Sequence, residues 1–311
     1  MAECTEPGLL AKLDQIPCLA VHPRQVEELS GGLTNRNLLV STATGRYVAR
    51  CAQSDTDLLG IDRDHEHLNS RAAAEAGVGA PVVDYRPDLG VLVIAYIDGV
   101  TFDNADLQRP GVLHRVAEAM RALHAGPRFA GDFDMFVRQR DYLDVVRTHG
   151  MHLPPTYLDY DERFQQIRQA LAAKPTATVP CNNDLLAGNI LDDGTTIWLI
   201  DYEYSGNNDP CFEIGNTAAE CALSDGQLAE LVTAYYAQDR ADKVARTRLQ
   251  RIVSRYGWAL WGYIQAATSP LDFDFTAWGD ERFDGAAAEL DGSGFAGLLE
   301  QMYADDARSA R

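Results

Sequence analysis

Three polar side chains near the middle of the chain have the types and spacing that phosphoryl transfer requires. Asp184 precedes Asn189 by five positions, and Asp201 follows twelve residues after Asn189 in the segment Ile-Asp-Tyr-Glu. In phosphoryl transfer an aspartate accepts the proton of the acceptor hydroxyl, while an asparagine oxygen and a second aspartate hold Mg²⁺, a hard cation that prefers oxygen ligands. Each residue alone is typical of a polar turn. Their combination indicates a site for phosphoryl transfer.

The segments around these residues are expected to bring them to one place. Asp184 and Asn189 lie in a predicted loop, which is followed by a short β pair with its turn at residues 192–194. Asp201 ends the apolar strand that follows this turn. A loop and a strand end arranged in this way place the three side chains at one end of a hairpin, facing a common cleft.

The N-terminal part of the chain has the pattern of a small β-rich unit. Residues 37–41 and 47–51 form two β runs joined by a turn at Thr44-Gly45, and residues 91–97 form a continuous apolar run typical of a buried strand. Residues 62–76 between them are predicted as a helix that ends at glycines.

The pattern of apolar residues changes after residue 98. Residues 112–124 have apolar side chains at helical spacing, and the rest of the chain is predicted to be mostly helical, with an interruption at 179–198. The sequence therefore predicts an α+β protein of two lobes: residues 1–95, small and rich in β-structure, and residues 96–311, larger and mainly α-helical.

Composition excludes several classes of protein. Hydrophobic residues make up 46% and charged residues 23% of the 311 positions, as in ordinary globular proteins. The net charge of −19 gives no general attraction to nucleic acid or to anionic membranes, so neither is expected as a partner. No apolar stretch is long enough to span a bilayer, no basic and apolar leader begins the chain, and the six cysteines form no Cys-x-x-Cys pair. We expect a cytoplasmic protein with reduced thiols, and the oligomeric state stays open.

The central motif resembles that of the choline/ethanolamine kinases, a branch of the aminoglycoside phosphotransferase family related to the protein kinases. That family has His-Asn-Asp-Leu-x-x-x-Asn and Asp-Phe-Glu-Tyr, and this chain has Asn182-Asn183-Asp184-Leu185 with Asn189, then Asp201-Tyr202-Glu203-Tyr204. The resemblance extends over residues 30–283. It implies a bilobal protein-kinase-like fold, with Asp184 as the catalytic base, Asn189 and Asp201 as ligands of Mg²⁺, and Glu203 as a further metal ligand.

The sequence departs from the family motif at Asn182, where the family has histidine. In the wider fold that histidine mainly supports the loop by packing and hydrogen bonding. Asparagine can still hydrogen-bond to the backbone, so we expect catalysis to be retained.

The resemblance also implies that the first lobe binds ATP. Residues 30–35 would form the loop that covers the phosphates, because glycines allow backbone N–H groups to approach oxygen atoms. Its candidate residues are Ser30, Gly31, Gly32, Thr34 and Asn35.

Arg50 ends the second β run, where the choline kinase branch uses an arginine to hold the phosphates. An acidic residue on the following helix would orient it; we favour Glu66, with Glu75 and Asp62 as alternatives. Tyr96 and Ile97 follow the apolar strand, and their backbone is expected to meet the adenine edge.

Aromatic residues in the C-terminal part suggest the acceptor. Trp258 and Trp261 are three positions apart and so share one helix face, a spacing that is also common in cores. In the family such a pair lines the choline pocket, and quaternary ammonium groups are recognised by aromatic faces and a nearby carboxylate. The resemblance adds further pocket residues: Tyr204, Glu220, Phe273 and Trp278.

The sequence thus predicts an ATP- and Mg²⁺-dependent transferase that phosphorylates the hydroxyl of choline or a related amino alcohol. Ethanolamine, an aminoglycoside, thiamine or a sugar remain as alternative acceptors. A catalytically impaired, kinase-like binding protein is the alternative from another class, with Asn182 as its first sign.

Overall fold

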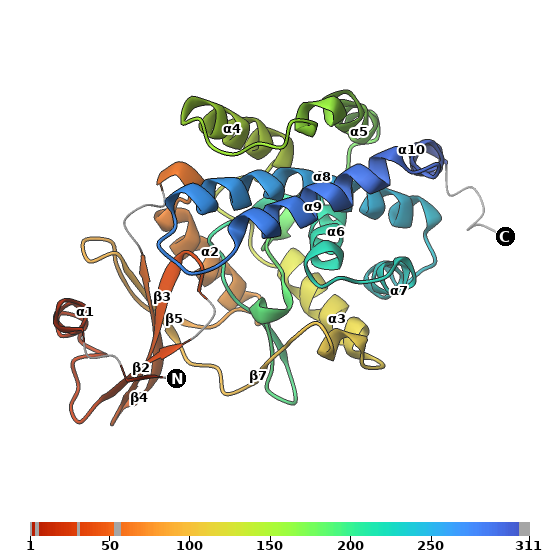
Figure 1. Cartoon of the computed structure of the whole chain (residues 1–311). Coiled ribbons are helices and arrows are strands. Elements are labelled where there is room, and N and C mark those ends of the chain that lie inside the picture. Colours follow the sequence, from red (N-terminus) through yellow and green to blue (C-terminus); the bar gives the residue numbers. More distant parts are fainter. Residues whose placement is uncertain (1, 4–5, 30–31, 53–56, 305–311) are drawn as a thin grey trace.

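The computed structural model describes residues 2–3, 6–29, 32–52 and 57–304. A six-stranded antiparallel sheet lies at one end of the molecule, and most helices lie in the remainder (Figure 1). Its strand order is β1-β2-β3-β4-β6-β5. The bilobal protein-kinase-like fold that the sequence predicts is confirmed.

The sheet is formed by β1 (Ala2–Glu3), β2 (Gln25–Leu29), β3 (Asn35–Thr42), β4 (Gly45–Ala52), β5 (Val82–Arg86) and β6 (Val91–Ala95). The predicted strands at 37–41 and 47–51 correspond to β3 and β4, and the turn between them is where the sequence places it. Alternating side chains of these strands pack on α1 (Pro7–Leu13), which covers the sheet's apolar face. This small core holds the strand that carries Arg50 in place.

The helix α2 (Arg63–Glu75) follows the sheet's first four strands after a short 3₁₀ turn at Asp57–Leu59. The side chain of Asp62 caps the helix by accepting a hydrogen bond from the N–H of His65. The predicted bounds of 62–76 therefore include the residue just before and the residue just after the helix.

The second lobe begins with β7 (Val100–Thr101), the 3₁₀ turn Asp106–Gln108 and α3 (Val112–His124). The bounds of α3 are those predicted from its apolar periodicity. The chain continues through α4 (Met135–Thr148), the 3₁₀ turn Tyr157–Tyr160 and α5 (Asp161–Ala173).

The interruption at 179–198 contains the strands that frame the predicted site. These are β8 (Val179–Cys181), the 3₁₀ turn Ala187–Asn189, β9 (Ile190–Asp192), β10 (Ile197–Leu199) and β11 (Gly206–Asn208). β8 pairs with β11, while β9 pairs with both β7 and β10. The two small ladders hold the loop between β8 and β9 beside the loop between β10 and β11.

Five helices complete the second lobe: α6 (Pro210–Glu220), α7 (Asp225–Tyr236), α8 (Ala241–Thr268), α9 (Phe275–Asp291) and α10 (Phe295–Tyr303). α8 and α9 run alongside each other (Figure 1), and α8 also packs on α4 and α6. Most residues of α8 from its second turn onward are buried, so it forms the axis of the lobe. No helix in the described part of the chain is both long and apolar enough to cross a bilayer.

Candidate active site

A cavity of about 1110 Å³ opens between the six-stranded sheet and the helical lobe. It receives side chains from β4, from the loops on either side of β9 and β10, and from α6, α8 and α9. The cavity is lined by most of the residues that the sequence singles out: Gly32, Thr34, Arg50, Tyr96, Ile97, Asp184, Asn189, Asp201, Glu203, Tyr204, Glu220, Trp258, Trp261 and Trp278.

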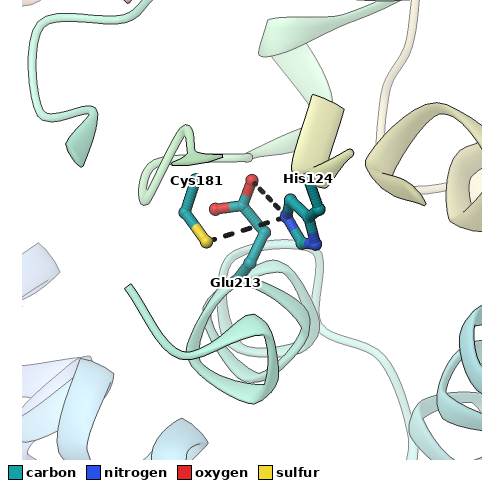
Figure 2. Close-up of side chains that lie close together, drawn as sticks. All are labelled: His124, Cys181 and Glu213. Carbon is teal, nitrogen blue, oxygen red and sulfur yellow. Dashed lines mark hydrogen bonds and ion pairs between the residues drawn. The ribbon is translucent and has the colours of Figure 1, made fainter. Parts of the chain in front are cut away.

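The loop that carries Asp184 is held by the buried carboxylate of Glu213, on α6. One oxygen of Glu213 accepts the N–H of Asn182 (2.9 Å) and the other accepts the N–H of Asn183 (2.6 Å). Figure 2 shows Glu213 between Cys181 and His124, at the start of the loop. Asp209 caps α6 and Pro210 begins it, which fixes where Glu213 lies.

His124, Cys181 and Glu213 are close enough to be considered as metal ligands. The ring of His124 lies 3.7 Å from both the thiol of Cys181 and the carboxylate of Glu213, and its other nitrogen is hydrogen-bonded to Tyr235 (2.7 Å). Since both oxygens of Glu213 already accept loop N–H groups, the cluster is explained as an anchor for the loop.

Asn183 adopts the left-handed backbone conformation, with a φ of 67°, which asparagine tolerates better than most residues. Its side chain donates to the carbonyl oxygens of Cys181 and Tyr204, and its own oxygen accepts from Asn208. The sharp turn that presents Asp184 is therefore fixed on both sides by neutral hydrogen bonds.

Asn182, which replaces the family histidine, also supports the loop. Its amide nitrogen donates to the carbonyl oxygens of Ile200 (3.0 Å) and Asp201 (2.8 Å), and its oxygen accepts the N–H of Asp184 (3.0 Å). The expectation that asparagine hydrogen-bonds to the backbone here is confirmed. One side chain thus ties the backbone at Asp184 to the backbone at Asp201.

Asp184 itself lines the cavity. Burial, and then the carboxylate of Glu220, raise the pKa of Asp184 well above its usual range. Asn189 donates its side-chain N–H to the carbonyl oxygen of Asp184 (2.8 Å). That bond occupies the nitrogen end of the Asn189 amide, so the oxygen is the end that can bind a cation.

Arg50 pairs with two carboxylates. Its Nε lies 3.1 Å from Glu66, the partner favoured from the sequence over Asp62 and Glu75, and its terminal nitrogens pair with Asp201. Burial alone would lower the pKa of Arg50, but the charges of Asp201 and Glu66 raise it. The arginine therefore bridges α2 to the predicted metal-binding segment.

Glu203 connects the same segment to the first lobe. It accepts hydrogen bonds from the hydroxyl of Thr34 (2.7 Å) and the amide of Asn35 (2.8 Å), and it pairs with Arg63 (3.2 Å). Burial and the nearby charge of Asp201 raise the pKa of Glu203 to about 7. Asn35 reaches the site through Glu203 and does not line the cavity itself.

Arg63 is a residue of the site that the sequence pattern did not single out. It lies three positions before Glu66 on α2 and contacts the Glu66 carboxylate at 2.7 Å, so the i, i+3 spacing was the signal that could have identified it.

The other residues predicted to bind the nucleotide differ in what the structure shows of them. Ser30 and Gly31 lie outside the described residues. A side chain at Gly32 would meet the carbonyl oxygen of Asn35 at 2.3 Å, so the tight backbone there requires glycine. Tyr96 donates its N–H to the carbonyl oxygen of Arg46 (3.1 Å), which leaves the next residue, Ile97, as the better placed of the two N–H donors for a ligand.

Four aromatic rings form one wall of the cavity. Trp258 donates its indole N–H to Asn216 (3.0 Å), and Trp261 donates to the hydroxyl of Tyr204 (2.8 Å). The ring centroids of Tyr204 and Trp258 are 4.9 Å apart, and those of Trp261 and Trp278 are 5.0 Å apart. Because the indole N–H groups of Trp258 and Trp261 are engaged within the protein, these two rings present mainly carbon surfaces to the cavity.

Glu220 lines the cavity beside this wall and is paired with Arg282, on α9. The Arg282 guanidinium also lies 3.2 Å from the ring centroid of Trp278. Arg282 lines the cavity and is not among the residues predicted from the sequence. Its position four residues after Trp278, on the same helix face, was the available signal.

Phe273 is a correction to the sequence-based expectation. Phe273 is 44% exposed, its ring meets the ring of Phe275 edge-on, and it does not line the cavity. It lies in the connection between α8 and α9, whose path cannot be inferred from spacing along a helix.

The donor set fits Mg²⁺. The amide oxygen of Asn189 and the carboxylates of Asp201 and Glu203 line one cavity, and all three groups supply oxygen ligands. Asp201 has a φ of 65°, a conformation that turns the backbone sharply at the end of the strand.

Comparisons with known proteins identify the family of this chain. The family model described as choline/ethanolamine kinase matches residues 26–243. Protein LicA of Haemophilus influenzae is 28% identical over 247 residues, covering 74% of this chain and 70% of LicA. A probable ethanolamine kinase of Arabidopsis thaliana is 26% identical over 285 residues, covering 80% of this chain and 75% of that protein.

Among solved structures, a choline/ethanolamine kinase family protein of Mesorhizobium loti matches with a TM-score of 0.83 and 35% identity, covering 94% of this chain and 97% of that chain. Since the family model spans most of the chain and both lobes match a relative of this kind, the protein belongs to the choline/ethanolamine kinase family, whose members are phosphotransferases acting on an alcohol group.

Proposed function

We propose that the protein transfers the γ-phosphoryl group of ATP, in the presence of Mg²⁺, to the hydroxyl of choline or a related amino alcohol. The observation that carries this proposal is a single cavity in which Asp184 lies with oxygen ligands and with an aromatic wall. Residues 1–95 would supply the nucleotide site, and residues 96–311 the base and the acceptor site.

In this proposal Asp184 accepts the proton of the acceptor hydroxyl. Its raised pKa in the free protein favours the protonated form, and a cationic acceptor bound nearby would lower that pKa towards the ionised form that a base requires. The anchored loop fixes the direction of Asp184, so the attacking oxygen is positioned before reaction.

Asn189, Asp201 and Glu203 would hold Mg²⁺, which neutralises charge on the β- and γ-phosphates when bound. Arg50 would hold phosphate oxygens. In the free protein Arg50 pairs with Asp201, so binding of the cation and the phosphates exchanges one set of charge contacts for another without leaving either group unpaired.

The aromatic wall favours choline among the possible acceptors. A trimethylammonium group has no N–H donors and is stabilised by aromatic faces at roughly 0.5–2 kcal/mol. A primary ammonium is strongly hydrated and needs several hydrogen-bond acceptors to replace its water. Tyr204, Trp258 and Trp261 mainly offer carbon, which supports a preference for choline over ethanolamine.

The test is a coupled ADP-release assay with choline, ethanolamine, thiamine, aminoglycosides and sugars, each with and without excess chelator. We expect kcat/KM to be highest for choline, exceeding that for ethanolamine by about tenfold or more. A higher value for a sugar or an aminoglycoside contradicts the acceptor assignment. Absence of ADP release with every acceptor favours the impaired binding protein instead.

A further inference from the structure

The acceptor side of the cavity already contains a cation of the protein itself, the guanidinium of Arg282. Its Nε donates to one oxygen of Glu220 (3.1 Å), a terminal nitrogen donates to the other oxygen, and the second terminal nitrogen donates to the carbonyl oxygen of Trp278 (3.3 Å). The exposed fractions of the side chains are 13% for Arg282 and 6% for Glu220. The pair is therefore bidentate and largely desolvated.

Arg282 uses two features that would otherwise attract an acceptor's cation. One is the carboxylate of Glu220, both of whose oxygens accept from the guanidinium. The other is a face of Trp278, which the guanidinium covers at 3.2 Å from the ring centroid. A planar guanidinium matches a carboxylate bidentately, whereas an ammonium acts as a point charge.

An amine that displaced Arg282 from Glu220 would bind with an unfavourable contribution to its free energy of binding. Breaking a buried pair without replacing both partners leaves an uncompensated charge, and a single ammonium could satisfy Glu220 but not Arg282. The aromatic surface of the cavity that Arg282 does not cover includes Tyr204, Trp258 and Trp261. That surface suits a cation that needs no hydrogen bonds.

We propose that Arg282 determines the acceptor specificity, because it withholds Glu220 and a face of Trp278 from the acceptor and so disfavours primary ammonium groups relative to quaternary ones. This inference rests on the proposed function, since it concerns the acceptor site of that reaction. It assigns the selectivity to an ion pair inside the protein in addition to the aromatic wall.

The test replaces Arg282 with methionine, which retains length and can pack on Trp278. Glu220 then lacks its partner and can accept hydrogen bonds from ethanolamine. We expect the ratio of kcat/KM for choline to kcat/KM for ethanolamine to fall by about tenfold or more, mainly through a lower ethanolamine KM, as charge-assisted hydrogen bonds allow. Calorimetric titration of each amine into the nucleotide-free protein should show the same change in the Kd ratio.

The double variant Glu220→Gln with Arg282→Met is the decisive control. It removes the carboxylate together with its partner, so the choline-to-ethanolamine ratio should return close to the wild-type value. Arg246→Met is the matched control for loss of a buried arginine, since Arg246 pairs with Asp209 and does not line the cavity. It should lower the melting temperature without changing the ratio.

Several outcomes overturn the proposal: an unchanged ratio in Arg282→Met, a shifted ratio that persists in the double variant, or a wild-type protein that binds ethanolamine better than choline. If Arg282→Met does not fold, Arg282→Lys replaces it. Lysine cannot hold both oxygens of Glu220, so a smaller shift in the same direction is expected and no shift contradicts the proposal. Binding without turnover in the wild type would refute the kinase function while the Kd ratios still test Arg282.

Discussion

The two loops that face the cavity are held in different ways. The loop of Asp184 is fixed by neutral hydrogen bonds from the side chains of Asn182 and Asn183. It is also fixed by the carboxylate of Glu213, both of whose oxygens accept N–H groups of the loop. The segment of Asp201 and Glu203 is instead held by ion pairs and hydrogen bonds that reach into the first lobe. The first loop is complete before ligands bind, whereas the second has partners that a cation and phosphates can replace.

This difference fits two separate tasks, the positioning of a base by the first loop and the binding of a cation by the second segment. A loop that must aim a base gains from contacts that do not change during the reaction cycle. A segment that must hold a cation gains from positively charged partners within the protein. These partners pair with its carboxylates before the cation binds, so the carboxylates are never left buried and unpaired. Variants in the two loops should therefore fail in different ways.

The largest effect is expected from Asp201→Ala, which removes a proposed metal ligand and a partner of Arg50. Magnesium bound by phosphates and only a few protein oxygens has few substitutes, so Mg²⁺-dependent turnover should fall to background in the ADP-release assay. Asn189→Ala should be milder, since water can replace a neutral amide. Asp88→Ala, at an exposed carboxylate, serves as the control. Wild-type turnover in excess chelator would refute the metal assignment.

Asp184→Asn should lower kcat by about 10²-fold or more, as removal of a general base typically does. The ATP KM should change little, because the backbone contacts of the loop are retained. Kinetics at saturating acceptor separate the two parameters. A variant that turns over near the wild-type rate excludes Asp184 as the base.

Glu213→Gln tests the fixed loop directly. The amide retains the shape of the side chain but can accept at only one end, so one loop N–H loses its partner and the free energy of unfolding should fall by about 1–3 kcal/mol. We expect kcat to fall and the ATP KM to stay unchanged, because the variant misplaces Asp184 without touching the nucleotide. Denaturant unfolding and steady-state kinetics provide both readouts. An ATP KM that rises with an unaltered kcat contradicts this role.

Trp261→Ala tests the acceptor wall, which is the most local of the binding features. The choline KM should rise several-fold and the ATP KM should stay near its original value, since one aromatic face is lost. Trp198→Ala, on the β10 strand and outside the cavity, is the matched control. If both variants lower the melting temperature and neither changes the choline KM selectively, Trp261 only packs the lobe.

The smallest effect is expected from Asn182→His, which restores the family residue. Histidine can replace only part of the three hydrogen bonds of Asn182, but the position does no chemistry, so kcat should change by less than about tenfold. A rise of several orders of magnitude would show that the natural protein is an impaired enzyme.

The sequence predicts the elements better than their partners. α3 follows directly from apolar periodicity, and β3 and β4 follow from two apolar runs and a glycine turn. The polar groups of the central motif lie together because β8 pairs with β11 and β9 pairs with β10, and both pairings are local in sequence. These features depend on nearby residues, which a single sequence displays.

The ion pairs could not be found in the same way. Arg282 and Glu220 are 62 positions apart, and their meeting depends on how α9 packs beside α6 and α8. Likewise the second partner of Arg50, the carboxylate of Asp201, comes from the other lobe. The predicted position of Phe273 in the acceptor pocket is wrong for a related reason, since a helix pattern says nothing about the path of the loop between two helices.

The buried thiols next to the loop of Asp184 can report local opening of this region. Cys181 precedes the loop, while Cys211 and Cys221 lie near the two ends of α6. All three are buried and their thiol pKa values are raised by that burial, so alkylating reagents can reach them as reactive thiolates only when this region opens. The rate at which an alkylating reagent modifies these cysteines therefore reports how often the loop and its anchoring helix separate, without any engineered label.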